Sequence, residues 1–303
     1  MLAPRLQSLH GFGMDLISFL PLSLMDGGLL TQLSTIRLVM RHANVPLRGQ
    51  LHFDDERSPE LDALHSITSF VGATAHTLQA FYTDLWVFNT WSCSPILSRL
   101  SAYHFPHLSS FRLKQPFEFT RPVDYAELDK FLHRHAATIT DYGLWQGPSV
   151  RGSAGAGDEY THPLARHVGA LTKLRTLSVH LWCGALWSTE PVKLSSDIVN
   201  AMVKVLQTMP DSVQSLGLAT DDHILLFAHQ LAELLRTPAT SPRRVTVLDR
   251  LRKLTTYVHH ATPELFDALA EGLPLLESLD ISVKQWIDVA DEDMVSHTMG
   301  VIA

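Results

Sequence analysis

The segment LTKLRTLSV, residues 171–179, sets the pattern for the whole chain. Within it, Leu174, Leu177 and Val179 follow the template L-x-x-L-x-L, where x is any residue. Successive strand residues point to opposite sides of a sheet, so Leu177 and Val179 share one face. The segment therefore predicts a short β-strand whose apolar side chains point inward.

The same sequence pattern recurs along the chain. In three segments an apolar helix-like run, a proline and a short strand follow one another, around Pro106, Pro210 and Pro274. Weaker copies fill the gaps, and one of them reads Leu254, Tyr257 and His259. Taking the first template position of each copy gives nine predicted strands, anchored at Leu6, Leu33, Leu78, Leu108, Ile139, Leu174, Val213, Leu254 and Leu276.

Amphipathic runs of helical length separate most of these anchors. The apolar residues recur at three- and four-residue spacings, which predicts helices over 124–135, 197–209 and 263–273. Thr262 followed by Pro263 is typical of a helix start, and Gly272 before Pro274 is typical of a helix end. The inward-facing residues expected in these helices are Leu128, Phe131, Leu132, Ile198, Met202, Val205, Leu206, Leu265, Phe266 and Leu269.

One helix–strand unit cannot bury its own apolar face, whereas stacked units can. The predicted fold class is therefore α/β, a leucine-rich-repeat solenoid with a curved parallel sheet inside, helices outside and irregular repeat length. We expect a single repeat domain over 1–303, truncated at one or both ends, because no polar cap is evident. The extra repeat length falls in polar or Gly/Pro-rich stretches, and the one at 146–160 predicts a flexible insertion.

At 171–179 and 273–281 the chain resembles the irregular leucine-rich-repeat regions of F-box proteins, especially the divergent fungal set. In that family an N-terminal F-box docks onto a Skp1-type adaptor of a cullin ubiquitin ligase, and the repeats recognise the substrate. No F-box is detectable here, and Leu6 already lies in a repeat-like strand. The resemblance thus implies a Skp1-type partner only if an F-box lies upstream, and it transfers adaptor binding to no residue of this sequence.

Composition narrows the remaining classes. The net charge is −7, and basic residues occur only in short clusters, which disfavours a nucleic-acid partner. The apolar stretch 16–25 is short and contains Pro21, so no membrane span is expected. The two cysteines, Cys93 and Cys183, are too few for a disulfide framework. Reduced, buried thiols in a cytoplasmic or nuclear protein are the simplest interpretation.

Seventeen histidines invite a test for metal-dependent or hydrolytic chemistry. No His-Glu-x-x-His motif is present, and the histidine pairs such as His133 with His135 lack a nearby acid at metalloprotease spacing. Arg151 occupies the last glycine position of a nucleophile elbow, and the Gly-rich stretch lacks a phosphate-cradle lysine. We therefore expect no enzyme activity, no catalytic or metal-binding residue and no cofactor, and a hydrolase or metal-dependent enzyme is the disfavoured alternative.

The best-supported function is a protein-interaction scaffold that binds a partner on the concave face of the sheet. A substrate receptor of an SCF-type ubiquitin ligase, with its F-box missing from this chain, is the alternative. Residues two, four and six places beyond each anchor should face the partner. Tyr, Trp and Arg dominate binding hot spots. The predicted partner-binding patch, across four neighbouring strands, is Tyr82, Arg112, Lys114, Trp145, His180 and Trp182. The two tryptophans could instead be core.

Overall fold

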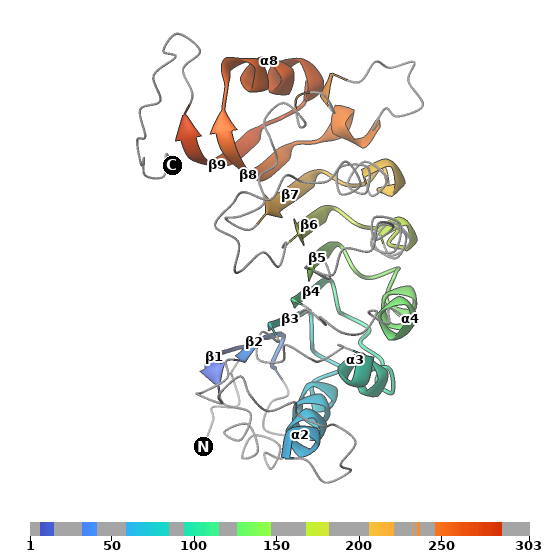
Figure 1. Ribbon diagram of the computed structural model, residues 1–303. Coiled ribbons are helices and arrows are strands. Elements are labelled where there is room, and N and C mark those ends of the chain that lie inside the picture. Colours follow the sequence, from blue (N-terminus) through green and yellow to red (C-terminus); the bar gives the residue numbers. More distant parts are fainter. Residues whose placement is uncertain are drawn as a thin grey trace. The chain divides into compact units, whose positions relative to one another are not determined.

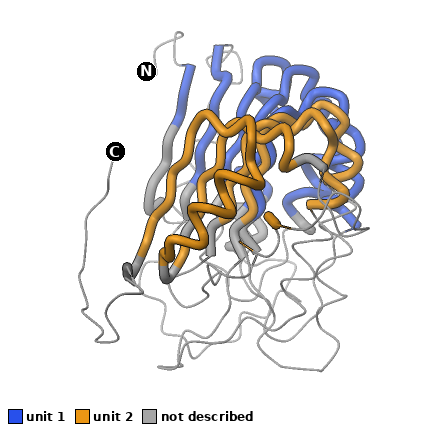
Figure 2. Tube along the Cα trace, turned by 90° about the horizontal axis from the view of Figure 1, so that it is seen from above, with its two compact units in different colours: residues 1–146 blue, residues 147–303 orange. Residues whose placement is uncertain are grey.

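A computed structural model describes residues 7–14, 32–40, 59–84, 94–114, 126–146, 168–181, 206–220, 232, 235–236 and 246–286. The chain divides into two compact units, Met1–Gln146 and Gly147–Ala303, called unit 1 and unit 2 below. They are coloured separately in Figure 2. Each is an α/β repeat structure of parallel strands and helices, so the predicted fold class is confirmed.

Unit 1 holds a parallel ladder of strands in chain order (Figure 1). The strands are β1 (Ser8–Met14), β2 (Thr35–Met40), β3 (Ala80–Asp84), β4 (Ser110–Lys114) and β5 (Asp141–Gln146). Three helices lie on one side of this ladder: α2 (Pro59–Ala73), α3 (Ser94–Leu100) and α4 (Ala126–Arg134). The predicted helix over 124–135 is confirmed as α4, which buries Leu128, Phe131 and Leu132 as expected.

The core of unit 1 lies between the strands and these helices. Phe111 on β4 is fully buried, and its ring centroid lies 6.1 Å from that of Phe81 on β3 and 6.3 Å from that of Tyr142 on β5. Phe131 of α4 approaches Phe111 to 4.9 Å between ring centroids. Equivalent template positions thus stack across neighbouring strands, and the helix closes the stack from the other side.

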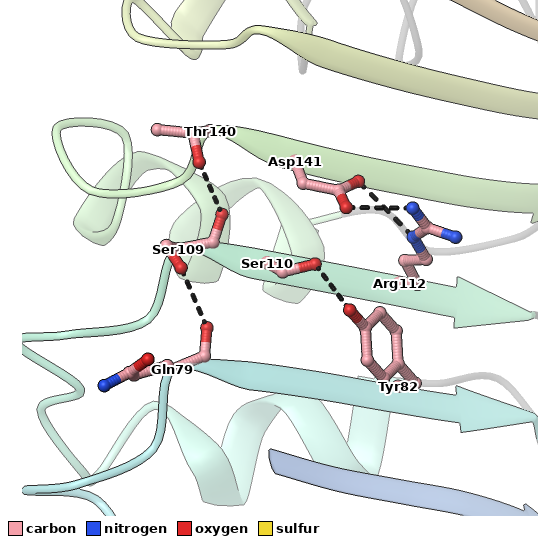
Figure 3. Close-up of polar contacts among 7 residues, drawn as sticks. All are labelled: Gln79, Tyr82, Ser109, Ser110, Arg112, Thr140 and Asp141. Atoms are coloured by element: carbon pink, nitrogen blue, oxygen red, sulfur yellow. Dashed lines mark hydrogen bonds and ion pairs between the residues drawn. The ribbon is translucent and has the colours of Figure 1, made fainter. Parts of the chain in front are cut away.

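In every strand pair that the structure describes, the later strand begins with the same backbone contact. Two consecutive N–H groups donate to one carbonyl of the preceding repeat, as Ser109 and Ser110 do to the oxygen of Gln79 at 2.8 and 3.0 Å. The Ser109 hydroxyl donates to that oxygen as well, and Thr140 Oγ1 donates to the Ser109 carbonyl one repeat later (Figure 3). This shared acceptor fixes the register of every pair that the structure describes, because it places the strand starts opposite one another.

Unit 2 repeats the arrangement with β6 (Thr176–Leu181), β7 (Ser215–Thr220), β8 (Lys253–Ala261) and β9 (Ser278–Trp286), all parallel. A 3₁₀ helix, η3 (Thr246–Arg250), precedes β8, and α8 (Pro263–Gly272) joins β8 to β9. Leu177, Leu216 and Leu254 are buried along one row of this sheet.

The predicted ends of α8 are confirmed. Thr262 is the N-cap residue with Pro263 in the first turn, and the helix ends at Gly272. The pKa of Glu264 is lowered because its own backbone N–H donates to the carboxylate and the Thr262 hydroxyl donates to it as well. Leu265 and Leu269 are buried as predicted, whereas Phe266 was wrongly placed in the buried stripe and is 36% exposed.

The predicted strand at Leu254 was shifted by three residues. The structure starts β8 at Lys253, so the first template position is Leu251, and the inward residues are Leu254 and Thr256. Thr256 is 3% exposed, and this buried polar residue breaks the all-apolar template. The predicted alignment, which ends on His259, also has a polar residue in the last position, so the template could not separate the two alignments.

Several expectations fall outside the described residues. They include Leu6, both cysteines, Ile198, Met202 and Val205, and the insertion at 146–160 beyond Gln146. Of the helix predicted over 197–209, residues 206–208 are described and helical, and Leu206 is buried. The single-domain assignment over 1–303 stays a prediction.

Candidate partner-binding surface

The side chains that alternate with the core residues of unit 1 form parallel rows on the opposite face of the strands. One row joins Ser110 on β4 to Asp141 on β5, and the next joins Tyr82 on β3 to Arg112 on β4. Because the register pairs strand starts with strand starts, side chains of equal offset lie side by side. This face brings together a cluster of four residues, Tyr82, Ser110, Arg112 and Asp141, which we call the outer cluster (Figure 3).

Arg112 is the centre of the outer cluster. Its Nη2 donates to Asp141 Oδ2 at 2.8 Å, and its Nε donates to Asp141 Oδ1 at 3.3 Å. This fork-to-carboxylate geometry fixes the plane of the guanidinium as well as its position. The register neighbour of Arg112 on β5 is Gly143, which has no side chain. Arg112 therefore pairs with Asp141, which lies two residues earlier on the same face of β5.

Tyr82 completes the cluster from the other side. The Arg112 Cζ lies 5.4 Å from the centroid of the Tyr82 ring, a cation–π distance. The Tyr82 hydroxyl lies 3.1 Å from Ser110 Oγ, within hydrogen-bonding distance. The ring is therefore held at both its face and its hydroxyl, so three neighbouring strands fix one polar and aromatic arrangement.

Ser110 is buried, whereas the charged members of the outer cluster remain open to solvent. The side chains of Arg112 and Asp141 are 33% and 24% exposed. A pair at this exposure contributes at most about 1 kcal/mol to the free energy of unfolding. Arg37 on β2, in register with Tyr82, is exposed as well. The arrangement is thus ordered by its contacts yet adds little to stability, which is the combination that a binding surface requires.

The structure brings some of the predicted partner-binding residues together. Tyr82 and Arg112 are in contact, and Lys114 and Trp145 occupy register positions opposite one another on β4 and β5. His180 lies on β6 in unit 2, and Trp182 lies outside the described residues. The patch across four strands therefore stays a prediction.

The predicted patch left out two members of the cluster, Ser110 and Asp141. Both stood at outward positions of the template, but residue types typical of hot spots were favoured over them. The available signal was the arginine at 112, two positions beyond Ser110, together with Asp141 at the first outward position of the next repeat. Recognising their contact requires the exact register of β4 against β5, which the template alone leaves open.

One buried titratable group lies elsewhere in unit 1. His135, at the end of α4, is 1% exposed and packs against Phe131 at 4.8 Å and Phe105 at 5.7 Å between ring centroids. Burial, with smaller contributions from the charges of the nearby His104 and Arg134, lowers its pKa from 6.5 to about 4. A histidine held neutral among aromatic rings is a core residue, and within the described part of the chain its Nε2 has no hydrogen-bond partner.

Searches for other kinds of site in the described part of the chain give two plain results. No group of three or more His, Cys, Asp or Glu side chains there could hold a metal ion. No helix among those residues has both the length and the apolar character needed to cross a membrane.

Comparison with known proteins adds a structural likeness. No protein-family profile and no curated protein matches the chain. Among solved structures, the chain is similar to the leucine-rich repeat-containing protein LegL7 from Legionella pneumophila, at 15% sequence identity and a TM-score of 0.48. The match covers 91% of this chain and 73% of that one.

Proposed function

We propose that the chain is a protein-interaction scaffold and that the outer cluster of unit 1 is the centre of its binding surface. The observation that carries the proposal is the ordered contact of Tyr82, Arg112 and Asp141 across three adjacent strands. Tyrosine and arginine are the residue types that most often dominate binding energy, and here both are held in place before a partner arrives.

Pre-ordering matters because binding must offset the entropy lost by each side chain that becomes fixed. That loss is roughly 0.5–1.5 kcal/mol for each long, flexible side chain. In the outer cluster Arg112 is already fixed by Asp141 and Tyr82, and Tyr82 by Ser110. A partner that contacts these groups would lose less entropy here than on an ordinary exposed face.

The experiment is affinity capture with the full chain as bait, from an extract of the cells that express it. Tyr82→Ala combined with Arg112→Ala should abolish capture of the partner found with the wild type. Lys130→Ala is the matched control, since it removes a cation that is 67% exposed on α4. Equal capture by the double variant and the wild type would overturn the proposed site.

A narrower form of the proposal follows the resemblance to F-box proteins, in which the bound partner is a substrate of a ubiquitin ligase. The same capture experiment tests this role, because a Skp1-type adaptor should then be recovered with the chain. An adaptor should be retained by the Tyr82→Ala and Arg112→Ala double variant, while the substrate should be lost.

A further inference from the structure

A second candidate binding surface is the outer edge of β9, which is the edge that faces away from β8. The N–H groups of Glu277 and Ser278 donate to the Arg252 carbonyl, so Ser278 directs its backbone groups toward β8. Backbone groups alternate in direction along a strand, and those of Leu279, Ile281 and Val283 therefore point away from β8. Among the described residues β9 pairs with β8 alone, which leaves this edge free to accept another strand.

The apolar row beneath this edge is also incompletely covered. Leu279 is 42% exposed, whereas Leu254 and Leu216, its neighbours in the same row, are 2% and 1% exposed. Leu275, in the turn before β9, is 52% exposed. An unpaired edge combined with exposed leucines is unfavourable in water, and both features point to a strand as the missing cover.

We propose that this cover is β9 of a second copy of the chain, paired antiparallel about a two-fold axis at Ser282. This register places Ile281 of each copy opposite Val283 of the other, on the inner row of the sheet. The backbone groups of Ile281 and Val283 point toward the edge, so the two residues can exchange both of their hydrogen bonds. Ser282 then meets its own symmetry mate as a pair that is not hydrogen-bonded.

Charge selects a second copy over an unrelated strand. In the same register Asp280 of one copy stands opposite position 284 of the other, which is a lysine. The two-fold axis repeats this pairing, so an acidic and a basic position of the sequence stand opposite one another on each side of Ser282. The segment is therefore complementary to itself in charge and in apolar pattern. The outer cluster of unit 1 takes no part in this interface.

Disulfide trapping tests the register. In an antiparallel pair that is not hydrogen-bonded the Cα atoms lie about 4.5 Å apart, within the range that a disulfide spans. Ser282→Cys should therefore give a covalent dimer on mild oxidation. Ser278→Cys is the control, because the two copies of position 278 would lie about 27 Å apart along the strands. The wild-type chain gives the background from its native cysteines.

A charge swap tests the partner. Sedimentation velocity over a concentration series should show a monomer–dimer equilibrium for the wild type. Asp280→Lys should raise the dimer dissociation constant about tenfold, and Asp280→Lys with Lys284→Asp should restore it. A wild type that stays monomeric at every concentration would overturn the proposal, since residues 287–303 or a different partner would then cover the edge. Equal cross-linking at 278 and 282, or no rescue by the swap, would overturn it too.

Discussion

His135 should make the stability of unit 1 depend on pH in the mildly acidic range. Its pKa is lowered from 6.5 to about 4 in the folded chain, chiefly by burial. Between these two values the unfolded chain binds a proton that the folded chain does not, so unfolding becomes more favourable as the pH falls. The contribution is complete above pH 6.5, decreases on acidification and is fully lost below about pH 4.

The size of the effect follows from the shift. One pKa unit corresponds to about 1.4 kcal/mol, so a change from 6.5 to about 4 removes about 3 kcal/mol of stability in total. Replacing the imidazole with a phenyl ring keeps an aromatic side chain between Phe105 and Phe131 and removes the titrating group. His135→Phe should therefore be within about 1.5 kcal/mol of the wild type at pH 7 and surpass it at pH 5.

Urea unfolding of the wild type and His135→Phe at a series of pH values measures the difference directly. Subtracting the two curves cancels the titration of the other histidines, which are common to both chains. His133→Gln removes an exposed imidazole from the same helix, and its acid dependence should follow that of the wild type. A constant difference between wild type and His135→Phe from pH 7 to pH 4.5 would refute the buried neutral histidine.

Four further substitutions test three particular contacts. Arg112→Ala and Asp141→Ala should each cost at most about 1 kcal/mol, and a double-mutant cycle by urea unfolding should give a coupling of similar size; a coupling near 3 kcal/mol would contradict the exposure of this pair. Thr256→Val should be neutral or stabilising by up to about 1 kcal/mol, because the buried Thr256 hydroxyl has no partner among the residues that the structure describes; a clear loss would reveal one. Gly272→Ala should destabilise unit 2 by about 1–3 kcal/mol in thermal melting, since the new Cβ would lie 2.8 Å from Leu235 Cβ and 3.0 Å from its carbonyl oxygen; an unchanged melting temperature would show that the two segments are further apart.

The strand positions could be predicted from sequence because the inner row demands apolar residues at fixed offsets. Leu108, Phe111 and Leu113 are all buried as the template requires. Prediction failed where two alignments matched equally well because both end on a polar residue, as at Thr256, and where an apolar residue lies on an exposed helix face, as at Phe266. Neither case is visible to a pattern that equates apolar with buried.

The outer cluster could be predicted only in part for a different reason. Tyr82 and Arg112 were identified by residue type and offset, and the parallel register then placed them side by side. Asp141 was missed because its role depends on the side chain of Arg112 reaching diagonally toward β5. Contacts of this kind depend on rotamers, and the spacing of the template contains no information about them.

Under the proposed function, alternate residues of β4 have different roles: one set packs in the core and the other faces a partner. Phe111 and Arg112 are adjacent, and Phe111 is fully buried while Arg112 is partly exposed. The most direct test measures the free energy of unfolding and partner capture for Phe111→Ala and Arg112→Ala side by side. Phe111→Ala should lose about 3–5 kcal/mol of stability. Arg112→Ala should lose at most about 1 kcal/mol and should also weaken capture of the partner. Similar destabilisation by both variants, or full capture by a folded Arg112→Ala chain, would contradict these roles.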